Sequence, residues 1–240
     1  MLRLDNSMSM FKQLSLPVGL DNQATFANFY APNGTPQHMA TFLLRDESRM
    51  FAYICGPQGS GLSHLLQAAC QINEAGSGGS HIYLPLKQLK NYSPNEVLDN
   101  LENSALICID DVEYVASSME WQMALFNLFN KCKDADCRLI IASHLSVDEL
   151  EFDLKDLHSR FKSGVCFVLP TFRDDDQRRM MQFRSNLRGL FLPDEVALFL
   201  LNRLPRDTHG LMDALDILDK ASLKEQRRLT IPFVKVTLDL

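Results

Sequence analysis

A glycine-rich segment at residues 56–63 carries residue types that can hold a phosphate group. Its sequence, GPQGSGLS, fits the spacing G-x-x-x-x-G-K-[ST] at every fixed position except the lysine, where Leu62 stands. Glycines let successive backbone N–H groups turn inward around a phosphate, and the positive end of a following helix adds to the same attraction. The predicted nucleotide-binding residues here are Gly59, Ser60, Gly61, Leu62, Ser63 and His64.

The missing lysine decides which nucleotide this segment favours. A lysine would carry a mobile positive charge to the β- and γ-phosphates, so Leu62 weakens the hold on a triphosphate more than the hold on a diphosphate. We therefore expect a bound nucleoside diphosphate, with ADP as the first candidate. The base stays open, because stacking on Phe26, Phe29 or Tyr30 would serve any base.

Two carboxylates follow the apolar run at residues 106–109. Asp110 and Asp111 therefore stand at the end of a buried strand, where an acid and a loop hydroxyl can hold Mg²⁺ beside the phosphates. We expect Asp110 and Ser63 to be the Mg²⁺ ligands when the ion is bound, and Asp111 to orient the attacking water. The simpler alternatives are a helix cap for the acids and a plain strand-to-helix turn for the glycines.

The arrangement of the other segments predicts a sheet that brings these motifs together. Apolar strand-like runs alternate with helical patterns, and continuous apolar strands imply burial on both faces of a parallel sheet between helices. From residue 174 the pattern is helical to the end of the chain, with a last short helix opened by Thr230. We predict an α/β fold with an N-terminal extension (1–22), a nucleotide-binding domain (23–171) and a helical lid domain (172–240). The expected strands are 53–55, 81–84, 105–109, 138–142 and 165–169, and the expected helices are 64–71, 94–101, 121–131, 174–187, 194–204 and 207–222.

Composition excludes several classes of protein. The 240 residues are 46% hydrophobic, which is normal for a folded soluble chain, and no apolar run approaches the roughly 20 residues that cross a bilayer. The first residues do not resemble a secretion signal, so we expect a cytoplasmic protein without membrane contact. A net charge of −6 opposes strong direct binding to DNA. The six cysteines are expected to be reduced, buried thiols, with too few neighbouring ligands for zinc.

Together these motifs resemble the AAA+ domain of the bacterial replication initiator DnaA, and most closely the Hda branch of that family, whose members inactivate the initiator. The resemblance covers nearly the whole chain. It includes residues 24–29 (ATFANF), similar to the segment that flanks the base, which places Phe29 there. Ser143, at the end of IIAS, falls at the sensor 1 position. In residues 156–161 (DLHSRF) the resemblance places Arg160 as an arginine finger.

An arginine on a polar segment is most often a surface salt-bridge partner. The resemblance implies another role for Arg160, because a guanidinium supplied in trans stabilises charge on the γ-phosphate of a neighbouring subunit. The implied partner is DnaA, and the implied activity is stimulation of its ATP hydrolysis rather than efficient turnover by this chain alone. A homodimer that shelters Arg160 until a partner displaces it is compatible with the same residues.

Two positions depart from the family pattern. Leu62 replaces the phosphate lysine, and His209, in RDTHGL, aligns with the lid arginine of sensor 2, although Arg206 is an alternative for that position. Both changes remove permanent positive charge from around the phosphates. The sequence also ends with the helical lobe, so we do not expect the helix-turn-helix domain that reads the replication origin in initiators.

A short peptide near the N-terminus, QLSLP, resembles the sliding-clamp-binding peptide of bacterial replication proteins. Its predicted contact residues are Gln13, Leu14, Leu16 and Pro17, which would place an amide and aliphatic side chains in an apolar pocket. The alternative is a strand that pairs with the edge of the core. The leading hypothesis is thus a clamp-bound regulator of DnaA; the alternatives are a self-contained AAA+ ATPase such as a helicase loader, and a DNA-binding initiator fragment.

Overall fold

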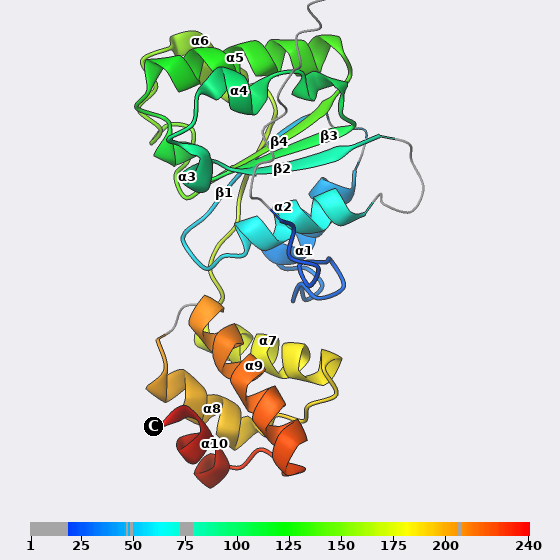
Figure 1. The fold of residues 1–240 in the computed structure, drawn as a ribbon, viewed down its shortest axis with the longest axis vertical. Coiled ribbons are helices and arrows are strands. Elements are labelled where there is room, and N and C mark those ends of the chain that lie inside the picture. Colours follow the sequence, from blue (N-terminus) through cyan, green and yellow to red (C-terminus); the bar gives the residue numbers. More distant parts are fainter. Residues whose placement is uncertain (1–18, 47, 49, 73–78, 206–207) are drawn as a thin grey trace, which may run out of the picture.

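Five parallel strands form the centre of the larger domain (Figure 1). The structure is a computed structural model, and it describes residues 19–46, 48, 50–72, 79–205 and 208–240. The strand order is β2-β3-β4-β1-β5, and every neighbouring pair is parallel. This confirms the predicted α/β class. The strands are β1 (Phe51–Cys55), β2 (His81–Pro85), β3 (Leu106–Asp110), β4 (Arg138–Ser143) and β5 (Val165–Val168).

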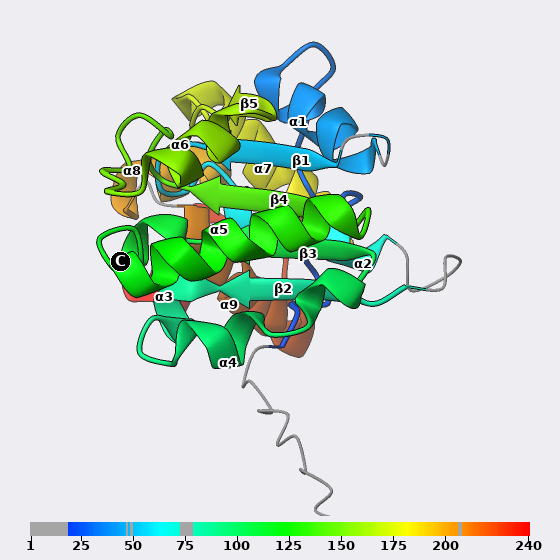
Figure 2. The same cartoon turned by 90° about the horizontal axis from the view of Figure 1, so that it is seen from above.

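Helices cover both faces of this sheet, which explains the continuous apolar strands. Successive side chains of a strand point to opposite faces, so Ile54 packs with one apolar cluster while Tyr53 and Cys55 pack with the other. Figure 2 shows α5 lying along one face of the sheet. One face is covered by α1 (Pro36–Arg45) and α2 (Leu62–Gln71), and the other by α3 (Leu86–Leu89), α4 (Pro94–Leu98), α5 (Met119–Asp134) and α6 (Lys155–Lys162), with short 3-10 turns η1 (Leu101–Asn103) and η2 (Val112–Tyr114).

Strand β5 lies at the edge of the sheet and departs from the expected burial. Its residues alternate between partly buried and exposed rather than being buried throughout. The prediction that all cysteines are buried is therefore wrong for Cys166, which is exposed on this strand. The other five cysteines are buried, and all six are free thiols. The reason is that an edge strand has a neighbour on one side only.

The helical lid begins after β5 and has its own apolar core. It consists of four helices: α7 (Asp174–Leu187), α8 (Asp194–Arg203), α9 (Thr208–Glu225) and α10 (Ile231–Leu238). Thr230 caps α10 by accepting a hydrogen bond from the backbone N–H of Phe233, as expected for a threonine before a helix. In the described part of the chain, no helix is long and apolar enough to span a membrane.

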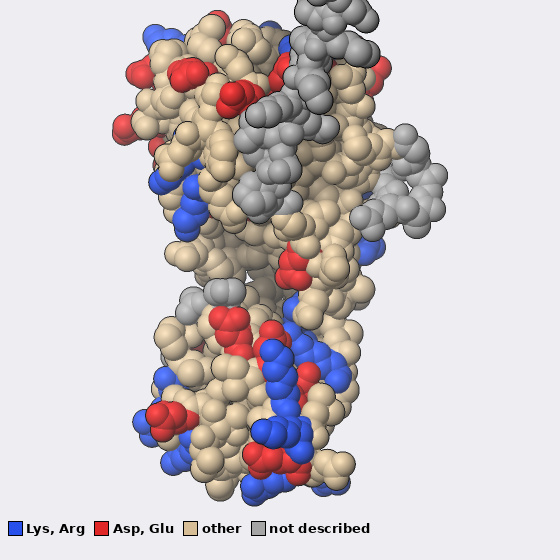
Figure 3. All heavy atoms as spheres, viewed as in Figure 1, with Lys and Arg blue, Asp and Glu red and all other residues tan. Residues whose placement is uncertain are grey.

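Side-chain hydrogen bonds between described residues join the larger domain to the segments that lead into and form the lid. Gln37 of α1 donates to the Pro170 carbonyl at 2.9 Å, Arg184 of α7 donates to the Asn28 carbonyl at 2.8 Å, and Thr208 of α9 donates to the Gly59 carbonyl at 2.8 Å. Tyr30 also packs against Phe172 and Phe183, with ring centroids 5.6 and 5.7 Å away. Figure 3 shows a recess between the two domains. The glycine-rich loop meets the lid through Thr208.

Candidate nucleotide-binding site

The glycine-rich loop connects β1 to α2, as predicted from its sequence. Gly59 and Gly61 adopt left-handed backbone angles, with φ of 82° and 97°. A Cβ atom on Gly61 would lie 2.6 Å from the Phe29 ring, so only glycine fits there. The first turn of α2 leaves backbone N–H groups without helical partners, and these point along the axis of the helix toward the loop. The loop therefore supplies donors for a phosphate without any lysine.

Leu62 has an apolar role in place of the expected positive charge. Its side chain is 3% exposed and belongs to the apolar cluster between α2 and the sheet. A buried leucine contributes on the order of 1.5–3 kcal/mol to folding but no charge to the phosphates. Leu62 therefore contributes to the stability of the core instead of to the positive charge around the phosphates.

Contacts of Phe29 and His64 connect the predicted base-flanking segment to the start of α2. The Phe29 ring is 8% exposed and lies 5.3 Å from the His64 ring. His64 Nε2 is 2.8 Å from the Thr25 carbonyl oxygen. Burial lowers the pKa of His64, and the contact with Thr25 opposes that effect. The other two aromatic candidates for base stacking also have protein partners, since Phe26 lies under the Arg45 guanidinium and Tyr30 packs against the lid.

Asp110 is held by two hydrogen bonds at the end of β3. It is 2% exposed, its Oδ2 accepts from the Tyr83 hydroxyl at 2.8 Å, and its Oδ1 accepts from the Asp111 backbone N–H at 3.0 Å. Ser63, the other predicted Mg²⁺ ligand, is exposed at the start of α2 and lowers the pKa of the Tyr83 phenol. Tyr83 was not identified from the sequence, because only the pairing of β2 with β3 brings it to Asp110.

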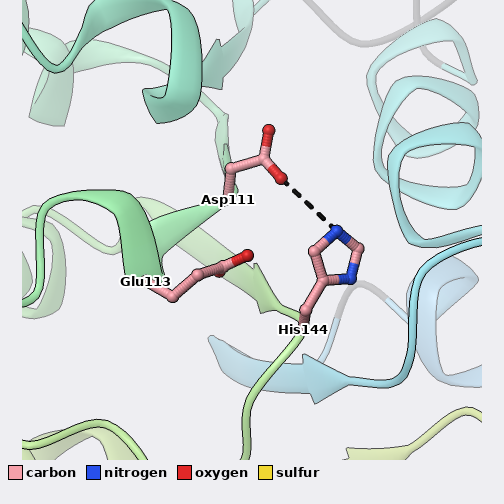
Figure 4. Close-up of side chains that lie close together, drawn as sticks. All are labelled: Asp111, Glu113 and His144. Atoms are coloured by element: carbon pink, nitrogen blue, oxygen red, sulfur yellow. Dashed lines mark ion pairs between the residues drawn. The ribbon is translucent and has the colours of Figure 1, made fainter.

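Asp111, Glu113 and His144 converge beside the loop (Figure 4). His144 Nε2 is 3.7 Å from Asp111 Oδ1, and its Nδ1 is 3.1 Å from the Gly56 carbonyl oxygen. Burial is the main cause that raises the pKa of Asp111 to about 6, and the charges of Asp110 and Glu113 add to it. Asp111 thus lies where a water-orienting acid was expected. Glu113 and His144 were not identified from the sequence.

Ser143 lies at the predicted sensor 1 position at the end of β4. Its side chain is buried, its carbonyl accepts from the backbone N–H of Gly56 at 3.2 Å, and so the residue adjoins the first residue of the loop. Its hydroxyl donates to Glu113 Oε2 at 2.8 Å and accepts from the Leu145 N–H at 3.0 Å. The hydroxyl therefore orients Glu113.

Arg160 lies on the last turn of α6, far from the loop of its own chain. Its guanidinium carbon is 5.8 Å from the Phe129 ring centroid and 6.0 Å from that of Phe126. Phe129 in turn packs edge-to-face on Phe51, the first residue of β1, whereas the loop follows the last residue of that strand. Arg160 therefore lies near the amino ends of the strands, at the edge of the sheet opposite to the loop. No carboxylate among the described residues forms an ion pair with it.

Some predicted site residues belong to the parts of the chain that the structure does not describe. Gln13, Leu14, Leu16 and Pro17 lie outside the described residues, as does Arg206. His209 belongs to α9, but its side chain is not among those described. The neighbouring Thr208 was not identified from the sequence, and its contact with Gly59 shows that this part of the lid meets the phosphate loop.

A strand, phosphate loop and helix, acids at the end of a neighbouring strand, and a helical lid that meets the loop define a P-loop AAA+ module. Comparison with protein families agrees with this class. The profile of the bacterial DnaA ATPase domain matches residues 20–168, and that of the Hda lid domain matches residues 174–238. The chain therefore belongs to the DnaA-related AAA+ proteins, within which its lid makes it Hda-like.

Individual proteins extend this comparison. A Haemophilus influenzae protein described as uncharacterized is 41% identical over 243 residues, which cover 96% of this chain and 100% of the relative. Domain III of the Thermotoga maritima replication initiation protein DnaA is 21% identical, with a TM-score of 0.76 over 92% of this chain and 98% of that one. AMPPCP-bound DnaA from Aquifex aeolicus is 23% identical, with a TM-score of 0.67 over 87% of this chain and 70% of that one. The two structures share the fold.

Proposed function

We propose that this protein regulates bacterial replication initiation by stimulating ATP hydrolysis on DnaA. It holds a nucleoside diphosphate, ADP first, binds the sliding clamp through residues 13–17 in the cytoplasm, and presents Arg160 to the nucleotide of DnaA. The joint match to a DnaA ATPase domain and an Hda lid supports this assignment. The position of Arg160 is the observation that carries it.

Arg160 is suited to act on another subunit rather than on its own. It lies near the edge of the sheet opposite to its own phosphate loop, and no described carboxylate neutralises it. The guanidinium carbon lies over the rings of Phe126 and Phe129 of α5, at 6.0 and 5.8 Å from their centroids, and the guanidinium carries five N–H donors that can bind a ligand. A planar donor held in this way can span two phosphate oxygens of a neighbouring nucleotide.

The chain's own nucleotide site favours a structural role for the diphosphate. Buried Leu62 brings no charge to a γ-phosphate, while the loop amides are retained. A self-contained ATPase, such as a helicase loader, would have to neutralise that phosphate by other means. We therefore propose that hydrolysis takes place on DnaA. The diphosphate bound by this chain stabilises the contact between the loop and the lid.

The decisive experiment measures the nucleotide bound to DnaA. DnaA loaded with labelled ATP is incubated with this protein and clamp-loaded DNA, and the bound ATP and ADP are quantified. The proposal predicts conversion to ADP only when all three components are present. Phosphate release without DnaA would support the ATPase alternative instead. Tight binding to DNA without the clamp would support an initiator fragment. Conversion that does not require the clamp would refute the role of residues 13–17.

A further inference from the structure

Tyr83 reaches from β2 to the acid at the end of β3. The parallel register pairs Tyr83 with Cys108 and Pro85 with Asp110, so the tyrosine starts two residues before the acid and its long side chain extends toward the phosphate edge. Its hydroxyl donates to Asp110 Oδ2 at 2.8 Å. Since the backbone N–H of Asp111 occupies Oδ1, both oxygens of this buried carboxylate already have protein donors.

The same hydroxyl lies between the residues that hold Mg²⁺ in P-loop proteins. In that class the ion is held by the hydroxyl at the end of the loop and the acid of the neighbouring strand, here Ser63 and Asp110. Asp110 accepts the hydrogen bond of the Tyr83 hydroxyl at 2.8 Å, and Ser63 and Gln67 lower the pKa of this phenol. Mg²⁺ requires nearly octahedral oxygen coordination at short distances and keeps several waters. Asp110 would have to share or give up the hydrogen bonds from Tyr83 and from the Asp111 N–H to become a ligand, so its placement fits a hydrogen-bonded carboxylate better than a Mg²⁺ ligand.

We propose that the Tyr83 hydroxyl takes the place of the divalent cation at the phosphate site, so that the protein binds a nucleoside diphosphate without Mg²⁺. This inference rests on the proposed diphosphate binding and adds its cation requirement. A phenol satisfies the buried carboxylate as a neutral donor, whereas Mg²⁺ would bring two positive charges. The backbone amides of the loop are then the donors left for the β-phosphate, and a γ-phosphate would lack both lysine and cation.

The surroundings of Tyr83 keep its hydroxyl protonated. Burial raises the pKa of Tyr83 well above its ordinary range, and the charge of Asp110 acts in the same direction, while Ser63 and Gln67 oppose the shift. A phenol is protonated at neutral pH, so Tyr83 can donate the hydrogen bond that Asp110 accepts. Asp110 needs such a donor, because a buried carboxylate without partners is strongly unfavourable.

The test compares the cation requirement of three proteins: the wild type, Tyr83→Phe, and Tyr92→Phe as the matched control. Tyr92 is exposed and lies outside the site. Each is titrated with N-methylanthraniloyl-ADP in excess Mg²⁺ and in excess EDTA. We expect the wild type, and Tyr92→Phe likewise, to bind no more tightly in Mg²⁺ than in EDTA, because no ion contributes at the site and Mg²⁺ only chelates the diphosphate in solution. Tyr83→Phe frees Asp110, so Mg²⁺ should now tighten binding by about tenfold.

A second variant and a second measurement guard against a trivial loss of structure. Adding Ser63→Ala to Tyr83→Phe removes the other ligand and should cancel the gained Mg²⁺ effect. Electron paramagnetic resonance of Mn²⁺ with ADP should show protein-bound ion for Tyr83→Phe, and only free and ADP-chelated ion for the wild type. Wild-type binding that needs Mg²⁺, or bound Mn²⁺ in the wild type, would overturn the inference alone. Failure of the wild type to bind the diphosphate in either buffer would overturn the inference and the proposed diphosphate site together.

Discussion

The two ends of the parallel strands, the carboxyl edge beside the phosphate loop and the amino edge near Arg160, differ in how positive charge is placed. At the carboxyl edge of the strands, where a P-loop protein gathers cations around phosphate, Leu62 is buried and Asp110 is satisfied by Tyr83. Near the amino edge, Arg160 keeps a guanidinium that no described carboxylate neutralises. A phosphate loop without its lysine, together with an arginine retained at a distant surface, is the pattern that the proposed action on a partner's nucleotide requires.

The energetic contexts of the two edges differ as well. Residues at the phosphate edge are buried and share hydrogen bonds, so their substitutions affect stability and ligand binding together. Arg160 contacts the faces of Phe126 and Phe129 at the surface of the core, and its removal should affect folding little. Substitutions at the two edges should therefore separate nucleotide binding by this chain from its proposed action on DnaA.

The largest effect is expected from Arg160→Ala. Stimulated hydrolysis by DnaA should fall by roughly 10³-fold, because the charge that stabilises the transferring phosphoryl group is lost. Arg160→Lys should restore little, since a point charge does not reproduce the planar fork. The measurement is the conversion of DnaA-bound ATP to ADP on clamp-loaded DNA.

The matched control for this prediction is Lys155→Ala, which removes an exposed positive charge from the first residue of the same helix. It should retain full stimulation. Equal conversion by the wild type and Arg160→Ala would end the finger assignment. A plain surface salt-bridge role would predict a loss of stability of at most about 1 kcal/mol and no change in stimulation.

The next largest effect is expected from substitutions in the proposed clamp-binding peptide, which belongs to neither edge. Changing Leu14 and Leu16 to Ala together should weaken clamp binding by at least about 10²-fold, because each buried leucine contributes about 1.5–3 kcal/mol. Affinity for the nucleotide should stay unchanged. Surface plasmon resonance on immobilised clamp measures the loss, and Leu2→Ala with Leu4→Ala provides a control of equal composition. Wild-type affinity in the Leu14 and Leu16 variant would refute the peptide assignment.

The spacing of apolar residues along the chain was sufficient to predict most of the fold. The strands and the lid helices come within a few residues of their expected ranges, because their apolar periodicity is strong and continuous. Helix α6 was expected only as a polar segment, since it buries just Leu157 and Phe161. Helix α1 was not expected at all, although Thr35 followed by Pro36 is a standard helix start.

The residues of the site likewise fall into two groups, those that local motifs predict and those that only the tertiary structure brings together. The glycine loop, the paired acids and Arg160 stand in short contiguous motifs, so their types and spacing are visible in the sequence. Tyr83 and His144 reach the site only through strand pairing and the loop after β4, and no local pattern marks them. These contacts depend on which strands are neighbours, and that order, β2-β3-β4-β1-β5, differs from the order along the chain.

Restoring the lysine tests whether the phosphate edge favours the diphosphate through lost charge. Leu62→Lys should shift the preference between ATP and ADP toward ATP by about tenfold, because the ammonium reaches the outer phosphates. It should also destabilise the fold by about 2 kcal/mol, since Leu62 is buried. Competition titrations measure the preference. Gln58→Lys adds the same charge at an exposed loop position, and an equal shift in this control would mean that net charge, rather than the lysine position, decides.

The smallest effect is expected from Asp111, whose raised pKa makes stability depend on pH. Burial, with the charges of Asp110 and Glu113, raises the pKa of Asp111 to about 6 against an ordinary value of 3.8, while His144 and Lys87 oppose the shift. The folded state thus holds this proton more tightly than the unfolded state. The free energy of unfolding should therefore fall as pH rises from about 4 to about 6, and change little above that range on account of this group.

Asp111→Asn removes the titrating group and should flatten this part of the profile. The variant should gain on the order of 1–2 kcal/mol at neutral pH, because solvent screens part of the effect of the raised pKa, and nothing near pH 4. Urea denaturation at a series of pH values measures the difference, with Asp153→Asn on an exposed loop as the control. A gain that is equal at all pH values would show that packing, rather than the crowded negative charge of the phosphate edge, sets the stability of this site.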